Sequence, residues 1–122
     1  MKNKNTIIYW IATGLFSAFM LLSGTMYFFQ NQMVVEAYVA LGYPPYLIYP
    51  VGALKILGAV AILFRKSLFL KNLAYAGFFF LLTLGVSAHL NVSDGGYAGA
   101  LVGLILVVIS YIYERKVFGR PL

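Results

Sequence analysis

The 122-residue chain contains no cysteine, one histidine, three acidic residues and a charged fraction of only 10%. The absence of cysteine excludes disulfide scaffolds, thiolate metal sites and iron–sulfur clusters held by cysteine. A single histidine also argues against a multi-histidine metal or haem site within one chain. Soluble domains carry about 25% charged and about 45–50% apolar residues, whereas 62% of this chain is hydrophobic. Because so short a chain cannot bury that much apolar surface in one core, the composition excludes an ordinary soluble enzyme and indicates a membrane protein.

Four long apolar runs are present, each near the roughly 20 residues that a helix needs to cross about 30 Å of hydrocarbon. The runs are continuous rather than alternating, which favours helices over barrel strands, because a helix satisfies its own backbone hydrogen bonds in lipid. We therefore predict an all-α fold, an integral membrane four-helix bundle that forms a single transmembrane domain over residues 1–122. The predicted spans cover residues 6–29, 46–64, 72–90 and 97–113.

The connection between the first two spans is longer than a tight helix–helix loop. Apolar residues recur at helical spacing over residues 32–43, and Gly42, followed by Pro44 and Pro45, supplies a stop signal. We predict a short amphipathic helix at the outer membrane interface that contains Glu36, with the two prolines turning the chain into the second span.

The basic residues predict the topology. Eight of the nine lie before the first span, between the second and third, or after the fourth, whereas residues 30–45 and 91–96 contain no Lys or Arg. Because Lys and Arg are retained in the cytoplasm, we predict that both termini are cytoplasmic. The basic residues behind the net charge of +6 then lie beside the membrane, where anionic lipids attract them. A nucleic-acid partner is therefore not needed to explain the positive charge. An aromatic belt is expected from the residues near the span ends, namely Tyr9, Trp10, Tyr43, Tyr46, Tyr49, Tyr97, Tyr111 and Tyr113.

Lys55 is the most informative single residue, because it lies about nine residues from either end of the second predicted span. Insertion scales assign roughly 2.5–3.5 kcal/mol to a lysine at the centre of a span, so it should face protein or water rather than lipid. Gly52 and Gly58 lie three residues to either side on the same face, where another helix can approach closely. We expect Lys55 to bind an anionic or carbonyl group or to form a buried ion pair; the alternative is a lysine that snorkels outward and only orients its helix.

Three further residues are expected to complete a pocket with Lys55. His89 lies near the outer end of the third span on a face shared with Tyr75 and Phe78. It is expected to donate a hydrogen bond or move a proton, although a lone histidine is also commonly a structural group. Tyr75 and Phe78 are expected to line the cavity.

The three acidic residues are the available charge partners. Glu36 is expected to pair with Lys55 or to gate the mouth of the pocket, the alternative being a solvated helix face. Asp94 is expected in a solvated turn or near His89, and Glu114 is expected on the surface among basic residues.

Small residues recur along the faces of the spans and are expected to permit close helix packing, or to form a homodimer contact. They are Gly14, Ser17 and Gly24 in the first span, Gly52 and Gly58 in the second, and Gly96, Gly99, Gly103 and Ser110 at or within the fourth.

Several segments resemble the DoxX-like branch of the DoxX family. They are residues 42–44 (GYP), 52–59 (GALKILGA), 74–80 (AYAGFFF) and 87–89 (SAH). The resemblance covers nearly the whole chain and implies a four-span protein of the bacterial inner membrane. Many relatives in the wider family carry an acidic residue near the position of Lys55, where the DoxX-like branch has lysine. Some members of the wider family are associated with membrane oxidoreductase systems, including thiosulfate oxidation that delivers electrons to quinone.

These observations lead to one functional hypothesis and two alternatives. We expect the protein to bind a quinone-like or other small amphipathic ligand, or a redox partner subunit, in an outward-opening pocket within the bundle. A quinone is the candidate cofactor, no metal or covalently bound cofactor is expected, and autonomous catalysis is not expected. The alternatives are a small homo-oligomeric transporter of an anionic or polar solute and a non-catalytic membrane assembly subunit.

Overall fold

The computed structural model describes residues 2–29, 31–92 and 97–118. Within these ranges all regular secondary structure is helical. The helices are α1 (Lys2–Phe29), α2 (Asn31–Leu41), the 3-10 turn η1 (Pro45–Leu47), α3 (Ile48–Phe64), α4 (Leu68–Val92) and α5 (Tyr97–Phe118). Four segments, α1, η1 with α3, α4 and α5, are long and apolar enough to cross a membrane. The predicted all-α, four-span architecture is therefore confirmed.

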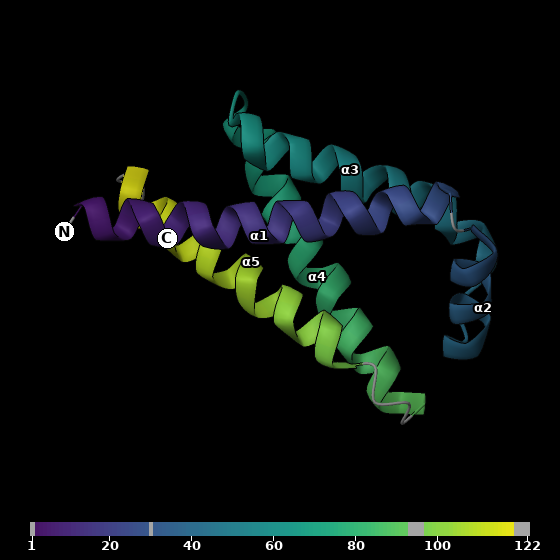
Figure 1. Ribbon diagram of the computed structural model, residues 1–122. Coiled ribbons are helices and arrows are strands. Elements are labelled where there is room, and N and C mark those ends of the chain that lie inside the picture. The colour runs from purple at the N-terminus through teal and green to yellow at the C-terminus, as the bar shows by residue number, and fades with distance from the viewer. Residues whose placement is uncertain (1, 30, 93–96, 119–122) are drawn as a thin grey trace.

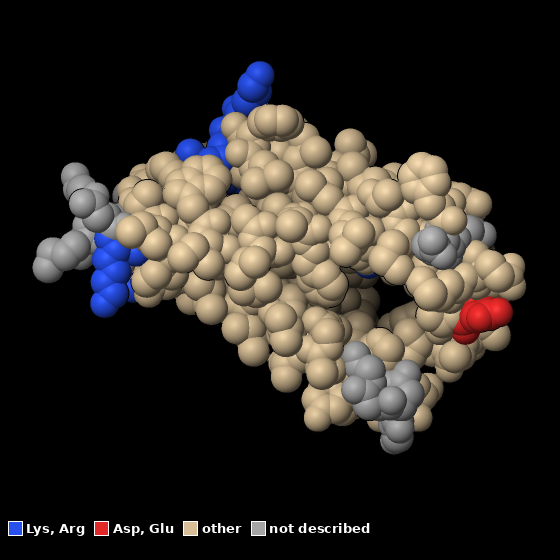
Figure 2. Space-filling view, in the orientation of Figure 1, with Lys and Arg blue, Asp and Glu red and all other residues tan. Residues whose placement is uncertain are grey.

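The four long helices form a bundle in which α1 is the central helix (Figure 1). α1 packs mainly against α3 and α5, and α4 packs against α5 and α3. We call one end of the bundle the basic end, because basic residues gather there near the ends of the long helices. They are Lys4, Arg65, Lys66, Lys71, Arg115 and Lys116. The opposite end carries α2, and Figure 2 shows the surface basic groups and the surface acidic group separated between the two ends.

Glycines allow three of the helices to approach closely. A Cβ atom added to Gly24 of α1 would lie 2.8 Å from Ile56 Cγ1 and 3.0 Å from the Gly52 carbonyl oxygen of α3. A Cβ atom at Gly58 of α3 would lie 2.8 Å from the Phe78 ring of α4. These contacts surround a core formed by Phe16, Met20, Ala59, Ile62, Tyr75, Phe78, Leu82 and Val107.

The other predicted packing residues divide into two groups. Ser17 is buried, and a Cβ atom at Gly103 would lie 3.2 Å from Leu82 and Phe19 side-chain atoms. A Cβ atom at Gly14 or Gly99 would have nothing within 4 Å. The structure therefore gives Gly14 and Gly99 no packing role within the chain, because both lie on outward faces. Gly96 and Asp94 lie outside the described residues.

The predicted connecting helix is present as α2, which lies across the end of α1 (Figure 1). It ends where expected, because Gly42 adopts a positive φ of 85° that favours glycine. The Gly42 and Tyr43 amides then donate to the carbonyl oxygens of Val39 (3.1 Å) and Tyr38 (2.9 Å). Pro45 begins η1, which leads directly into α3.

The helices at the basic end extend further than predicted. α4 begins at Leu68 and α5 ends at Phe118, whereas the predicted spans began at residue 72 and ended at residue 113. Ser67 stabilises the earlier start, because its Oγ accepts a hydrogen bond from the Leu70 amide at 3.2 Å. The extensions bring Lys71 and Glu114 into the packed bundle. Tyr9, predicted in the aromatic belt, is likewise fully buried, since it packs edge-on against Phe118 of the extended α5.

Candidate functional site

Lys55 faces the interior of the bundle rather than lipid. Only 9% of the residue is exposed, and its Nζ donates a hydrogen bond to Ser23 Oγ of α1 at 2.7 Å. The same nitrogen lies 4.2 Å from the centroid of the Tyr27 ring, also on α1. Within the described part of the chain, Lys55 forms no ion pair with a carboxylate. A hydroxyl and an aromatic face thus solvate this ammonium group, which retains two further N–H donors.

α2 is attached to this site through tyrosines. Tyr38 OH donates a hydrogen bond to Tyr27 OH at 3.1 Å, and the two rings meet edge to face. Burial and this hydrogen bond raise the pKa of Tyr38, so its phenol remains a donor well above neutral pH. Tyr43, just after α2, donates to the Leu84 carbonyl oxygen of α4 at 3.4 Å. These hydrogen bonds link α2 and the residue that follows it to both α1 and α4.

A hollow opens on this side of the molecule. Figure 2 shows it over the region that Figure 1 places between α1, α2 and the second half of α4, with a basic group visible in its depth. It lies toward the end opposite the basic end (Figure 2).

The structure separates the other residues that the sequence placed with Lys55. Lys55 makes no hydrogen bond or ion pair with Glu36 or His89 among the described residues, so the predicted Glu36–Lys55 pair is absent. Glu36 is exposed on α2 because its helix turns the opposite face, with Val34, toward the bundle. His89 is half-buried in the last turn of α4.

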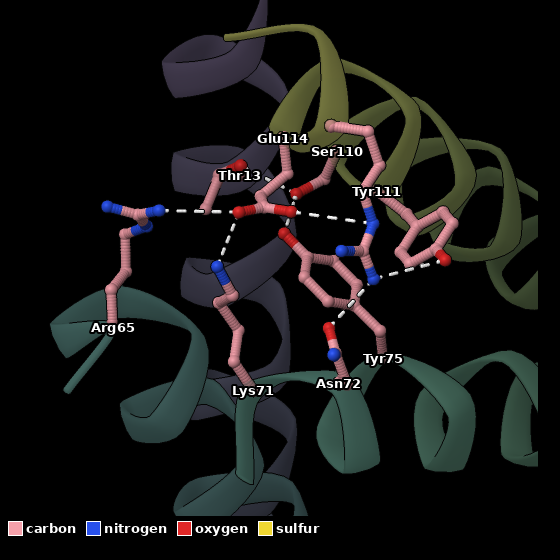
Figure 3. A network of polar contacts seen from close by, with 9 residues as sticks. Thr13, Arg65, Lys71, Asn72, Tyr75, Ser110, Tyr111 and Glu114 are labelled. Atoms are coloured by element: carbon pink, nitrogen blue, oxygen red, sulfur yellow. Dashed lines mark hydrogen bonds and ion pairs between the residues drawn. The ribbon is translucent and has the colours of Figure 1, made fainter. Parts of the chain in front are cut away.

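Tyr75 and Phe78 belong to the packed core rather than to a cavity around Lys55. Phe78 packs edge-on against Phe16, with ring centroids 5.0 Å apart. Tyr75 OH is hydrogen-bonded to Ser110 Oγ at 2.7 Å, and Ser110 Oγ is hydrogen-bonded in turn to Thr13 Oγ1 at 2.6 Å. This chain of hydroxyls links α4, α5 and α1 inside the bundle (Figure 3).

A buried charge cluster lies beside these hydroxyls at the basic end. Glu114 is fully buried, which corrects its predicted place on the surface. Its Oε2 accepts hydrogen bonds from Lys71 Nζ and, at 3.3 Å, from Arg65 Nη2, and its Oε1 lies 3.7 Å from Arg115 Nε. Figure 3 shows Arg65 and Lys71 converging on Glu114. Among the described side chains, three cations thus contact one carboxylate, and together these four groups carry an excess of positive charge.

Arg115 has two more partners at the edge of the cluster. One of its terminal nitrogens donates to Asn72 Oδ1 at 2.9 Å and to Tyr111 OH at 3.2 Å. Its guanidinium carbon lies 4.7 Å from the centroid of the Tyr111 ring. α4 and α5 therefore hold the guanidinium in one position.

Sequence reasoning missed this cluster, although one signal was present. Glu114 follows Ser110 by four residues, and Lys71 precedes Tyr75 by four, so each charge shares a helix face with a residue of the buried hydroxyl chain. If the third and fourth predicted spans had been extended by one turn at the basic end, both charged residues would have fallen within them on these buried faces.

A sequence model of the DoxX-like family matches residues 11–112. No curated protein and no solved structure matches the chain significantly. The matched segment covers most of the chain, including the middle of all four spans, Lys55 and His89. The chain belongs to the DoxX-like family.

Proposed function

We propose that the protein binds a quinone-like or other small amphipathic molecule in the hollow beside Lys55. The observation that carries this proposal is the Lys55 ammonium group, which is nearly buried in the middle of a span and, among the described residues, makes its polar contacts with a hydroxyl and an aromatic ring. A charge at this depth is costly unless a polar group accepts its protons. A ligand that brings an oxygen acceptor would use the two N–H donors that Ser23 leaves over.

The depth and surroundings of Lys55 favour a ligand that enters from the bilayer. Tyr27 offers a ring face beside the ammonium group, and Tyr38 extends this aromatic wall toward α2. A flat ring with a carbonyl oxygen and an apolar tail matches this combination of one strong donor and aromatic walls. Glu36 and His89, from α2 and the end of α4, are the proposed polar residues at the mouth.

The proposal assigns binding to this chain. Electron transfer to or from such a ligand would be the task of an oxidoreductase partner subunit. We further propose a bacterial inner-membrane location with the basic end in the cytoplasm, which the distribution of Lys and Arg supports. Reporter fusions before α1 and after α5 test this orientation, and an external location of either fusion would refute it.

Lys55→Met tests the binding site directly. The change keeps a long side chain and removes the donor, and it leaves no carboxylate unpaired, so the bundle should stay folded. The measurement is binding of the short-chain quinone decylubiquinone to protein in lipid nanodiscs. A hydrogen bond from a charged donor contributes about 1.5–3 kcal/mol, so affinity should fall roughly 10- to 100-fold.

Lys116→Met is the matched control, because Lys116 is an exposed lysine at the basic end. It should bind the quinone as the unmodified protein does. Equal affinity of the Lys55 variant, or absence of quinone binding by the unmodified protein, would refute the proposal. Uptake of a small anion into proteoliposomes that depends on Lys55, without quinone binding, would instead favour a transporter.

A further inference from the structure

A groove runs between α4 and α5 on the outer surface of the bundle, away from Lys55. It has a volume of about 560 Å³, and both helices contribute to its walls. Its polar lining consists mainly of Asn72, Tyr111 and Arg115, and its apolar lining includes Phe79, Phe80 and Val107. The volume falls within the roughly 300–1,000 Å³ that is typical of sites for small amphipathic molecules.

The polar and apolar parts of the lining lie at different depths. Asn72 is in the first turns of α4 and Arg115 in the last turn of α5, so both lie at the basic end. Phe80 lies eight residues further along α4, and Val107 eight residues back along α5, which places both about 12 Å deeper in the membrane. An occupant therefore needs a polar group at the basic end and an apolar chain directed toward the bilayer centre.

The positive charge at the polar end of the groove favours an occupant whose polar group is negatively charged. Arg115 shares the carboxylate of Glu114 with Lys71 and Arg65, so these four described side chains carry three formal positive charges and one negative charge. The Arg115 Nε–H is buried and donates no hydrogen bond to any of the described residues. Asn72 and Tyr111 hold the guanidinium at the wall of the groove. An anionic group there would offset the excess positive charge.

We propose that this groove binds an anionic phospholipid, with its phosphate against Arg115 and an acyl chain along Phe79 and Phe80. Basic pockets between transmembrane helices suit anionic headgroups, and the cytoplasmic leaflet supplies such lipids. Arg115 lies beyond the segment that the family model matches. The groove is separate from the hollow beside Lys55, so lipid binding in the groove can be tested independently of quinone binding.

Native mass spectrometry of protein released from vesicles of equal parts phosphatidylglycerol and phosphatidylcholine tests the proposal. The unmodified protein should retain one phosphatidylglycerol in preference to phosphatidylcholine. Arg115→Gln should lower this retention by at least about tenfold, since it removes a charge-assisted contact. Lys116→Gln makes the same change of charge at the next, exposed residue and should leave retention unchanged.

A second variant keeps the charge cluster intact in case Arg115→Gln impairs folding. Ala76 lines the groove and is exposed, so Ala76→Trp should fill the groove and displace the acyl chain. Ala98→Trp, on an exposed position of α5 outside the groove, is its control. Equal retention of the two lipids by the unmodified protein would overturn the proposal. So would normal retention by Ala76→Trp, or equal losses in the Arg115 and Lys116 variants.

Discussion

Replacing Glu114 by glutamine should destabilise the bundle by about 3–5 kcal/mol. The substitution keeps the size of the side chain and removes its charge. Glu114 is 0% exposed and Lys71 1% exposed, so the lysine would be left as a buried cation without its carboxylate. The guanidinium groups of Arg65 and Arg115 would lose the same partner, although the Arg65 side chain is 20% exposed and water would solvate it in part. The expected change corresponds to a loss of roughly 100- to 4,000-fold in the folding equilibrium.

Unfolding in mixed detergent micelles, followed by the fluorescence of Trp10, measures this change. Trp10 is the single tryptophan and packs against Tyr9, whose ring contacts Phe118 at the basic end. Glu36→Gln is the control, because it makes the same chemical change at an exposed position and should alter stability by less than about 0.5 kcal/mol.

A double substitution separates the ion pair from a general packing defect. Combining Lys71→Met with Glu114→Gln removes both buried charges of the closest pair, so the combined loss should be smaller than the sum of the single losses by about 1–3 kcal/mol. Strict additivity would show that the two charges do not stabilise one another. A Glu114 variant as stable as the Glu36 variant would refute the reasoning altogether.

Two further predictions concern helix packing. Gly24→Ala should destabilise the bundle by about 1–3 kcal/mol, since the new methyl group would lie 2.8 Å from Ile56 Cγ1; Gly14→Ala, which meets nothing within 4 Å, should be tolerated in the same unfolding assay. Ser110→Ala should destabilise the bundle by about 1–2 kcal/mol, because it removes two hydrogen bonds between helices, whereas Thr83→Ala, whose exposed hydroxyl donates to the Phe79 carbonyl oxygen of its own helix, should have little effect. A result in which either control is as damaging as its partner variant would contradict the packing described above.

The spans and the connecting helix could be predicted because their signals are local. Long apolar runs mark the membrane helices, and Gly42 with the prolines marks the end of α2. The start of α4 and the end of α5 could not be predicted, because charged residues lower the hydropathy of a segment and so mark the end of a predicted span. Lys71 and Glu114 remain in the bundle since each neutralises the other, and their pairing joins residues 43 positions apart.

The candidate site was predictable in part for the same reason. A lysine in the middle of a span must avoid lipid, so the inward direction of Lys55 followed from its position alone. Its actual neighbours, Ser23 and Tyr27, depend on how α1 and α3 are rotated against each other, which no pattern within one helix reveals. Glu36 has the right charge to pair with Lys55 but lies on the outward face of α2.

The position of Glu114 in the last helix has a consequence for biosynthesis. α1 emerges from the ribosome first, yet its main partners are α3 and α5. A nascent chain that has completed only α1 to α4 already carries Arg65 and Lys71, but not the carboxylate that both contact in the finished bundle. Insertion of α5 supplies that carboxylate and the second partner of α1 in one step. A chain that stops after α4 therefore differs from one that contains α5, because the positive charges of Arg65 and Lys71 lack the Glu114 carboxylate.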